Sequence, residues 1–441
     1  MNWPQLLSSH RLGQKQDALD QSRSAFEQDY DRIIFSHPFR RLQDKTQVHP
    51  LPVEDFVHTR LTHSLEVSSV GRSLGKKVGE EILKRHAELN KDFSLFDFGA
   101  IVAAASLAHD LGNPPFGHAG EEAISDFFIH HEKGKSLKPF VTESEWADLT
   151  NFEGNAQGFR LLNQKQYGLK LTAATLGAFT KYPCPSFFPE RDKTKKSQKK
   201  FGFFESERGV FENVATDLGL VKINANSWSR HPLAFLVEAA DDICYSLIDL
   251  EDGCRLGLVS LDETIALIAA ILKDKFKKDK VDKMVGLNEK LGVLRALAIG
   301  QLLDESVALF LDEEKNILDG KFDRALTDEI VSGDALKEIS KVSVDKIYRA
   351  RTVVEIEASG HAVLPGLLEE FVVAAQSLQQ NNASRKHKNL QLLLPEEIRW
   401  ALANQTETPN QMLRLIVDFI SGLTDRHALS LYRKIKGISY S

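Results

Sequence analysis

An adjacent histidine and aspartate, His109 and Asp110, end a segment that is otherwise apolar nearly throughout, residues 98–111. Gly112 and the two prolines that follow it soon after are typical of a helix stop. An ionised carboxylate is rarely buried without a partner, so Asp110 needs a cation or several hydrogen bonds. A divalent metal ion would meet that need, because two adjacent side chains at a helix end can both turn toward one ion.

Two more polar insertions into apolar segments offer further ligands. His63 lies at the start of an amphipathic segment, and Asp241 and Asp242 interrupt the apolar residues 232–250. Two histidines and two carboxylates form a mixed nitrogen and oxygen site, which suits Mn, Fe, Co, Ni or Zn and tolerates Mg. A single His-Asp pair would more simply be a hydrogen-bonded pair in the core, but three separate insertions weaken that interpretation.

The elements that must position these residues are predicted to be helices. Apolar residues recur in steps of three and four from Val67 to Ile82, which indicates an amphipathic helix. Residues 98–111 and 232–250 are apolar on most sides and favour helices buried in a core. No alternating run is long enough to anchor a sheet, except residues 352–356. The prediction is an all-α fold with at most a small β ribbon.

Composition excludes several classes of protein. The 441 residues are 42% apolar and 27% charged, which is ordinary for a globular chain. No apolar run approaches the ~20 residues of a membrane helix, and the first residues do not form an apolar signal segment. The three cysteines fit neither a zinc pattern nor a disulfide framework, so we expect a cytoplasmic protein. The polar runs 190–200 and 273–283 are predicted to be solvated loops or exposed helix faces.

The order His63, His109-Asp110, Asp241 resembles the H…HD…D signature of the HD-domain phosphohydrolases. Longer blocks resemble the dGTPase-like deoxynucleoside triphosphate triphosphohydrolases within that group: DYDRIIFSHPFRRLQDKTQV, HTRLTHSLEV, HDLGNPPFGHAGE, NFEGNAQGFRLL, EAADDICYSLIDLEDG and SGLTDRHALSLY. They span the chain from near Ser22 to residue 432. The resemblance implies one triphosphohydrolase unit over 1–441, with an HD metal-binding catalytic core at 55–255 and additional helices at 256–441 for oligomerisation or regulation.

The resemblance also assigns a metal site, with His63, His109, Asp110 and Asp241 as ligands. We choose Asp241 over Asp242 because Asp241, Tyr245 and Asp249 recur every four residues and share one helical face. In the family this arrangement brings a tyrosine and an aspartate near the sugar 3′-hydroxyl. Without the resemblance, a half-buried core tyrosine would be the better interpretation of Tyr245. The expected cofactor is Mg²⁺ or Mn²⁺, ahead of Fe, Co, Ni or Zn.

Proton transfer is assigned to His118 and its acidic partner Glu121. Their spacing of three residues would place them on one side of a helical turn, where a carboxylate raises the basicity of an imidazole. From the residues alone, a surface His-Glu pair at a helix start is an equally good interpretation. Some HD triphosphohydrolases carry a further histidine where this chain has Asn113. We therefore expect proton transfer in this chain to depend on His118.

The substrate contacts are likewise implied by the resemblance. Arg60 precedes His63 by three residues, shares its helical face and is expected at the α-phosphate. The other expected contacts lie along the rest of the nucleotide: Lys181, Tyr182 and Lys200 at the phosphate tail, Glu153 and Asn155 beside them, Gln47 near the sugar or base, and Tyr245 and Asp249 at the 3′-hydroxyl.

The predicted reaction is metal-dependent hydrolysis of a dNTP, with dGTP favoured, to a deoxynucleoside and inorganic triphosphate. One alternative is another HD phosphohydrolase, acting on a cyclic nucleotide or a nucleoside monophosphate. A second alternative is a nucleotide-sensing or single-stranded-DNA-binding protein with a vestigial site. The resemblance implies a homo-oligomer, with a hexamer favoured, and leaves open a second dNTP as activator and single-stranded DNA as a further ligand. We expect no membrane partner.

Overall fold

The computed structural model describes residues 1–13, 22–48 and 57–438. These residues form helices and no strand; their only β contacts are isolated bridges. The predicted all-α class is therefore confirmed, whereas residues 352–356, considered for a ribbon, lie in the first turns of a long helix, α19 (Arg351–Gln379). No helix within the described residues is long and apolar enough to cross a membrane.

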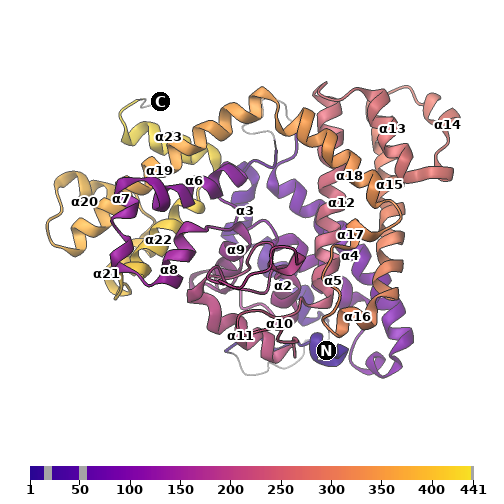
Figure 1. Cartoon of the computed structure of the whole chain (residues 1–441), viewed down its shortest axis with the longest axis horizontal. Helices are drawn as coiled ribbons and strands as arrows, with labels where there is room; N and C mark the ends of the chain where they lie inside the picture. Colours follow the sequence, from indigo (N-terminus) through magenta and orange to yellow (C-terminus); the bar gives the residue numbers. More distant parts are fainter. Residues whose placement is uncertain (14–21, 49–56, 439–441) are drawn as a thin grey trace.

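The helices form an elongated molecule (Figure 1). The first half of the chain supplies α1 (Trp3–Leu6), α2 (Ala25–Ile34), α3 (His37–Arg41), α4 (Arg60–Arg85), α5 (Leu95–Ala108), α6 (Gly117–His130), α7 (Glu132–Lys135), α8 (Glu143–Thr150), α9 (Gly154–Asn163), α10 (Ala173–Phe179), α11 (Arg208–Asp217) and α12 (Pro232–Arg255). The second half supplies α13 (Leu261–Leu272), α14 (Lys278–Asp282), α15 (Leu287–Asp312), α16 (Glu314–Leu318), α17 (Leu326–Glu329), α18 (Gly333–Val342), the π-helix η8 (Ser343–Tyr348), α19, α20 (Arg385–Leu392), α21 (Glu396–Asn404), α22 (Pro409–Ser421) and α23 (Asp425–Ile435).

Helices α4 and α5 form a close antiparallel pair at the centre of the first core. Glycines at every fourth position of α4 face α5: a Cβ on Gly75 would lie 2.6 Å from the Phe98 carbonyl oxygen, and one on Gly79 would lie 2.8 Å from the Phe98 side chain. Their lack of a side chain lets the two backbones approach. Because the helices run in opposite directions, the start of α4, with His63, meets the end of α5, where His109 follows.

Helix α12 packs against both α4 and α5 and contributes the third element of the site. The His231 side chain caps its first turn by accepting a hydrogen bond from the Leu233 amide, and Pro232 occupies a position where no amide hydrogen is needed. The predicted helix over 232–250 is confirmed and extends to Arg255. Its long apolar side is buried, so the acidic residues between the apolar positions are carried into the interior.

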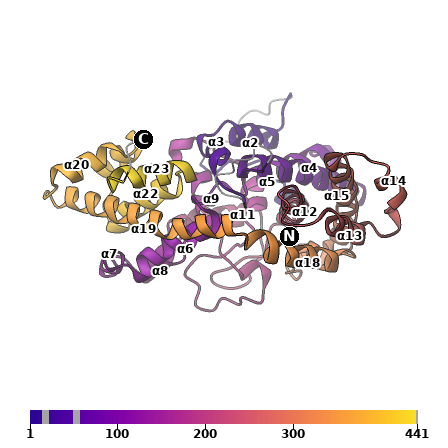
Figure 2. The same ribbon diagram turned by 90° about the horizontal axis from the view of Figure 1, so that it is seen from above.

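The second half of the chain does not form a separate layer. Helices α13, α15 and α18 build a third core cluster with the C-terminal part of α12. Helices α19, α22 and α23 pack at the other end with α6, and α19 runs between the two ends of the molecule (Figures 1 and 2). The described helices that follow α12 therefore contact the earlier helices at both ends of the molecule.

The two polar runs differ from each other. Residues 190–200 form a loop with one short 3₁₀ turn, as predicted, although Ser197 and Gln198 within it are buried. Residues 273–283 contain a 3₁₀ turn and the short exposed helix α14.

Candidate active site

Two histidines and an aspartate converge at the junction of α4 and α5. One ligand atom from each of His63, His109 and Asp110 lies within 4.8 Å of the other two, and all three residues are buried. Asp241 approaches from α12: its Oδ1 lies 3.2 Å from His63 Nε2 and 3.4 Å from His109 Nε2. The four residues expected as metal ligands therefore come together.

The donor set fits a divalent cation. His109 Nδ1 lies 2.7 Å from the Ser106 carbonyl oxygen, which can only accept a hydrogen bond, so Nδ1 carries the proton and Nε2 is left with a free lone pair. That Nε2 is buried and has no hydrogen-bond partner. A buried imidazole nitrogen without a hydrogen-bond partner, next to a second imidazole and two carboxylates, is a donor set that can bind Mn²⁺, Fe²⁺, Co²⁺ or Zn²⁺.

Each carboxylate of this group also has a cationic partner. Asp110 accepts from Arg60 Nη1 at 2.8 Å, and the second oxygen of Asp241 pairs with Lys181 Nζ at 2.6 Å. Burial alone would raise the pKa of Asp241, but the ammonium group of Lys181 counters it and helps to hold that pKa well below its usual range. The two acids are therefore ionised and face two fixed cations, a setting prepared for an anionic ligand.

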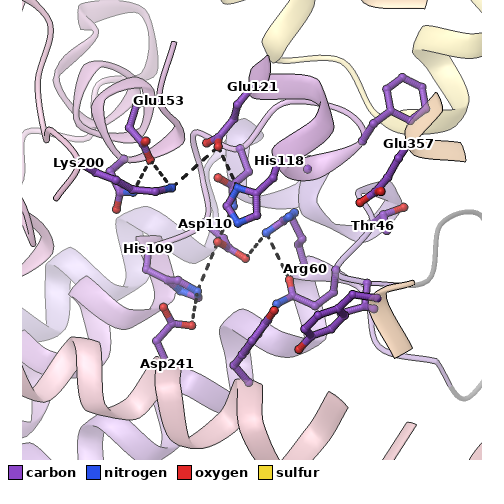
Figure 3. A pocket seen from close by; sticks show the side chains of 18 of the residues that line it. Thr46, Arg60, His109, Asp110, His118, Glu121, Glu153, Lys200, Asp241 and Glu357 are labelled. Carbon is purple, nitrogen blue, oxygen red and sulfur yellow. Dashed lines mark hydrogen bonds and ion pairs between the residues drawn. The ribbon is translucent and has the colours of Figure 1, made fainter. Parts of the chain in front are cut away.

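His118 and Glu121 lie on the first turn of α6, above the metal group (Figure 3). Glu121 Oε2 is 2.9 Å from His118 Nδ1, and Oε1 accepts from the Gly154 amide at 2.7 Å. Burial opposes ionisation of Glu121, yet His118 and Lys200 hold its pKa below its usual range. The carboxylate fixes the orientation of the imidazole and leaves its Nε2 for a reactant, as expected of a proton-transfer pair.

The expected phosphate-tail residues gather beside this pair. Lys200 Nζ lies 3.1 Å from Glu153 Oε1, which also accepts from Asn155 Nδ2 at 2.8 Å. Gly112 brings them near the metal group: a Cβ there would lie 2.0 Å from the Gly154 carbonyl oxygen, so only glycine permits this approach of α9. Burial, followed by the nearby Glu121, raises the pKa of Glu153. Tyr182 lines the same region, and burial raises its pKa to about 12.

The residues expected at the sugar separate into two environments. Tyr245 lies at the pocket surface with 38% of its area exposed, and its ring centroid lies 5.6 Å from that of Tyr348. Asp249 lies below them, 3% exposed, and accepts a hydrogen bond from the Tyr348 hydroxyl at 2.7 Å. Asp249 is not among the residues that line the pocket. In this structure it orients Tyr348.

Comparison with known proteins identifies the family to which the chain belongs. Residues 60–144 match the HD domain, and residues 331–434 match the phosphohydrolase-associated domain. The chain is 42% identical to a deoxyguanosinetriphosphate triphosphohydrolase-like protein of Synechocystis sp. and 40% identical to one of Pseudomonas aeruginosa, over 100% of this chain and 99% or more of each relative. It is 32% identical to a deoxyguanosinetriphosphate triphosphohydrolase of Yersinia enterocolitica over 93% of both. The chain belongs to the dGTP triphosphohydrolase-like family of HD-domain phosphohydrolases.

In this HD phosphohydrolase a single cavity of about 370 Å³ joins these groups. Lys200 and Glu153 lie toward one end, His109, Asp110 and Arg60 in the middle, and Thr46 and Glu357 at the other end (Figure 3). Gln47 also lines it, with its side-chain oxygen 3.3 Å from Arg60 Nη1. His63 lies beneath the cavity floor, 1% exposed.

The sequence prediction missed one wall of this cavity. Tyr348, Val353, Ile356 and Glu357 line it from η8 and the start of α19, inside the phosphohydrolase-associated domain. None of them is a charged residue in an apolar run, which was the signal that identified the metal group. The residues 352–356 alternate enough to suit a strand, and nothing in their composition indicates contact with the pocket.

Proposed function

We propose that this phosphohydrolase cleaves dNTPs, dGTP in preference, to a deoxynucleoside and inorganic triphosphate. The observation that carries the proposal is the shared cavity: it joins the His63, His109, Asp110 and Asp241 group to a proton-transfer pair and to three cationic side chains. A polyphosphate needs such cations beside the reacting phosphorus, and a neutral or singly charged substrate does not.

The ends of the cavity indicate the orientation of the nucleotide. The end with Lys200 suits the β- and γ-phosphates, and the middle, with Arg60 and the metal group, suits the α-phosphate. Beyond Arg60, the rings of Tyr245 and Tyr348 would flank the sugar. The carboxylate of Glu357 lies at the far end (Figure 3), and the apolar residues Val48, Val353 and Ile356 also line the cavity. Such a site can sandwich a base and accept hydrogen bonds from its edge.

A preference for guanine follows from that carboxylate. Guanine presents two adjacent donors on its Watson–Crick edge, the N1 hydrogen and the N2 amino group, and a carboxylate has two acceptor oxygens for them. Adenine offers an unprotonated N1 at the same place, which would repel a carboxylate. Glu357 therefore supports dGTP over dATP.

In the proposed reaction, water attacks the α-phosphorus, the bond between that phosphorus and O5′ breaks, and O5′ leaves as the hydroxyl of the deoxynucleoside. A bound divalent cation would polarise an α-phosphate oxygen. Arg60 and Lys181 would neutralise charge on the phosphate, and Lys200 would hold the tail. His118, held by Glu121, would take up the proton of the water or deliver one to O5′ through Nε2.

Product analysis with labelled water tests this proposal. Each dNTP is incubated with Mg²⁺ or Mn²⁺ in H₂¹⁸O, with and without a second dNTP as activator, and the products are separated by chromatography. We expect deoxyguanosine and triphosphate, with the label in the triphosphate. Parallel incubations with a cyclic nucleotide or a nucleoside monophosphate test the alternative HD phosphohydrolase activity, which would release a linear monophosphate or orthophosphate. Label in the nucleoside would exclude attack at phosphorus.

We also propose that the chain works as a homo-oligomer, with a hexamer as the expected state, as the resemblance to the family implies. Light scattering on the purified protein measures the assembly directly. Single-stranded DNA as a further ligand is tested by adding an oligonucleotide to the same turnover assay.

A further inference from the structure

Three segments far apart in the sequence meet behind the cavity. They are residues 45–47, which end in Gln47, residues 113–118, which end in His118, and residues 421–425 between α22 and α23. The first two contribute side chains to the cavity. The third, from the phosphohydrolase-associated domain, has no residue in it.

Asp425 joins all three segments through one carboxylate. Its Oδ1 accepts from the Phe116 amide at 3.0 Å, and its Oδ2 accepts from the Thr46 amide at 3.0 Å and also from the Thr46 hydroxyl. The residue is 1% exposed, so water does not compete for these bonds. Two backbone donors on two different oxygens require a carboxylate, because a side-chain amide has one acceptor only.

The backbone that Asp425 holds is strained. Phe116 has a φ of +66° and Gly117 a φ of +58°, and His118 follows at once. A left-handed conformation is uncommon for a bulky residue and persists only where the surroundings enforce it. Helix α19 adds a second restraint, since Gly360 lies so close that a Cβ there would be 3.1 Å from the Phe116 side chain.

Lys45 makes a parallel connection between the same segments. Its ammonium group donates to the Asn113 carbonyl oxygen at 2.5 Å and to the Ser421 carbonyl oxygen at 2.8 Å, and the residue is 3% exposed. The side chain of Asn113 in turn donates to Asp110 at 2.5 Å. A cation buried against two carbonyl groups costs desolvation free energy, which the surrounding contacts must offset.

We propose that Asp425 and Lys45 are positioning residues, through which the C-terminal helices hold the turn that presents His118 to the reacting phosphate. This inference rests on the proposed function of His118. The proposed metal ligands lie on α4, on α12 and directly after the end of α5, and Asp425 contacts none of them. The Asp425 connection is therefore expected to act on proton transfer and to leave metal binding nearly unchanged, whereas Lys45 also reaches Asp110 through Asn113.

The decisive variant is Asp425→Asn, which keeps the shape of the side chain and removes one acceptor. A displacement of catalytic groups by about 1 Å can cost on the order of 100-fold in rate, so we expect kcat for dGTP to fall about 10- to 100-fold. We expect KM to change less than about threefold, since the phosphate contacts of Lys181 and Lys200 are untouched, and metal content to equal that of the parent protein.

Two matched controls come from the same C-terminal helices. Arg426→Gln changes the next residue of α23, whose side chain is 71% exposed, and should leave kcat, KM and melting temperature unchanged. Ile416→Val removes one buried methyl group from α22 and should lower the melting temperature without lowering kcat. A loss of kcat in Ile416→Val equal to that in Asp425→Asn would overturn the proposal, because general destabilisation would then explain both.

Hydrogen exchange supplies a readout that does not need turnover. In Asp425→Asn the amide of Phe116 or of Thr46, whichever loses its acceptor, should exchange at least about tenfold faster, while the amides of α5 stay protected. Unchanged exchange at both amides would also overturn the proposal. If Asp425→Asn does not fold, Lys45→Met and Thr46→Val replace it, with the same expected direction in kcat and exchange.

The two proposals fail in different ways. If the parent protein releases no triphosphate from any dNTP, the proposed function is wrong, and the exchange measurement still decides whether Asp425 holds the turn. If the parent protein is active and the variants match it in kcat and in exchange, the function stands and the positioning role is wrong.

Discussion

The two walls of the cavity are built on different principles. The wall with the metal group consists of charged and imidazole side chains that are nearly all buried and contact one another: His63 and His109 face Asp241, and Asp110 faces Arg60. The other wall, with Tyr245, Tyr348 and Glu357, is aromatic, apolar or exposed, and the buried Asp249, which does not line the cavity, accepts a hydrogen bond from the Tyr348 hydroxyl.

We infer that the wall with the metal group carries out the reaction and that the other wall determines which substrate is bound. Removing one member of a buried charged group leaves its partners unpaired, which costs more than the lost contact alone. Changing an exposed side chain on the other wall leaves no such penalty. We therefore expect substitutions in the first wall to abolish the reaction and substitutions in the second to redirect it.

The largest effect is expected at the metal group. His109→Ala or Asp110→Ala should remove bound metal and lower turnover on the order of 10⁴-fold, because a metal ion supplies several kcal/mol of transition-state stabilisation. Elemental analysis, circular dichroism and triphosphate release measure metal, helix content and activity in one preparation. Full metal occupancy in both variants would contradict the ligand assignment.

His118→Ala should lower kcat by about 10³-fold, within the range of general acid–base groups, with metal content near that of the parent protein. Metal analysis beside steady-state kinetics distinguishes this variant from the ligand variants. A loss of less than threefold, with product release shown not to limit the rate, would remove His118 from the mechanism.

Tyr245→Ala should shift the ratio of kcat/KM for dGTP over GTP by about 10- to 100-fold toward GTP, since a pocket without the ring has room for a 2′-hydroxyl. Absolute dGTP turnover should fall as well. Tyr245→Phe keeps the ring and should keep the ratio. An unchanged ratio in Tyr245→Ala would make this residue part of the core packing only.

The smallest effect is expected at Glu357. Glu357→Gln should reduce the preference for dGTP over dATP about fivefold, because the amide accepts one hydrogen bond where the carboxylate accepts two, at an exposed position. Glu355→Gln, on the same helix but outside the cavity, is the matched control. Competition between the two nucleotides in one reaction measures the ratio directly.

The same contrast explains what could be predicted from the sequence. His109-Asp110 and Asp241 were visible because a charge within an apolar helix demands a partner, and the structure brings the three together with His63. The all-α class followed from the helical spacing of α4, α5 and α12. These inferences depend on burial, which can be predicted from the apolar pattern of neighbouring residues in the sequence.

The second wall gave no comparable signal. Tyr348 and Glu357 are ordinary residues of a helical segment about 100 residues beyond Tyr245, and the packing of η8 against α12 and of α19 against α6 brings that segment to the cavity. The sequence analysis expected the catalytic core to end at residue 255. In the folded chain, residues before and after this position line the cavity. Asp249, expected at the sugar, has the right helical face but is covered by Tyr348.

The contacts of Asp425 have a consequence for how the protein is made. The ribosome synthesises this residue about 180 residues after Asp241, the last of the four proposed metal ligands, which takes roughly 10–40 s at ordinary rates of translation. Through that interval the emerging chain already carries every metal ligand, but Thr46 and Phe116 lack the acceptor that joins them. If Asp425 holds the turn as proposed, a nascent or prematurely terminated chain carries the proposed metal ligands while His118 lacks this support, and full activity begins only when the last helices have been released.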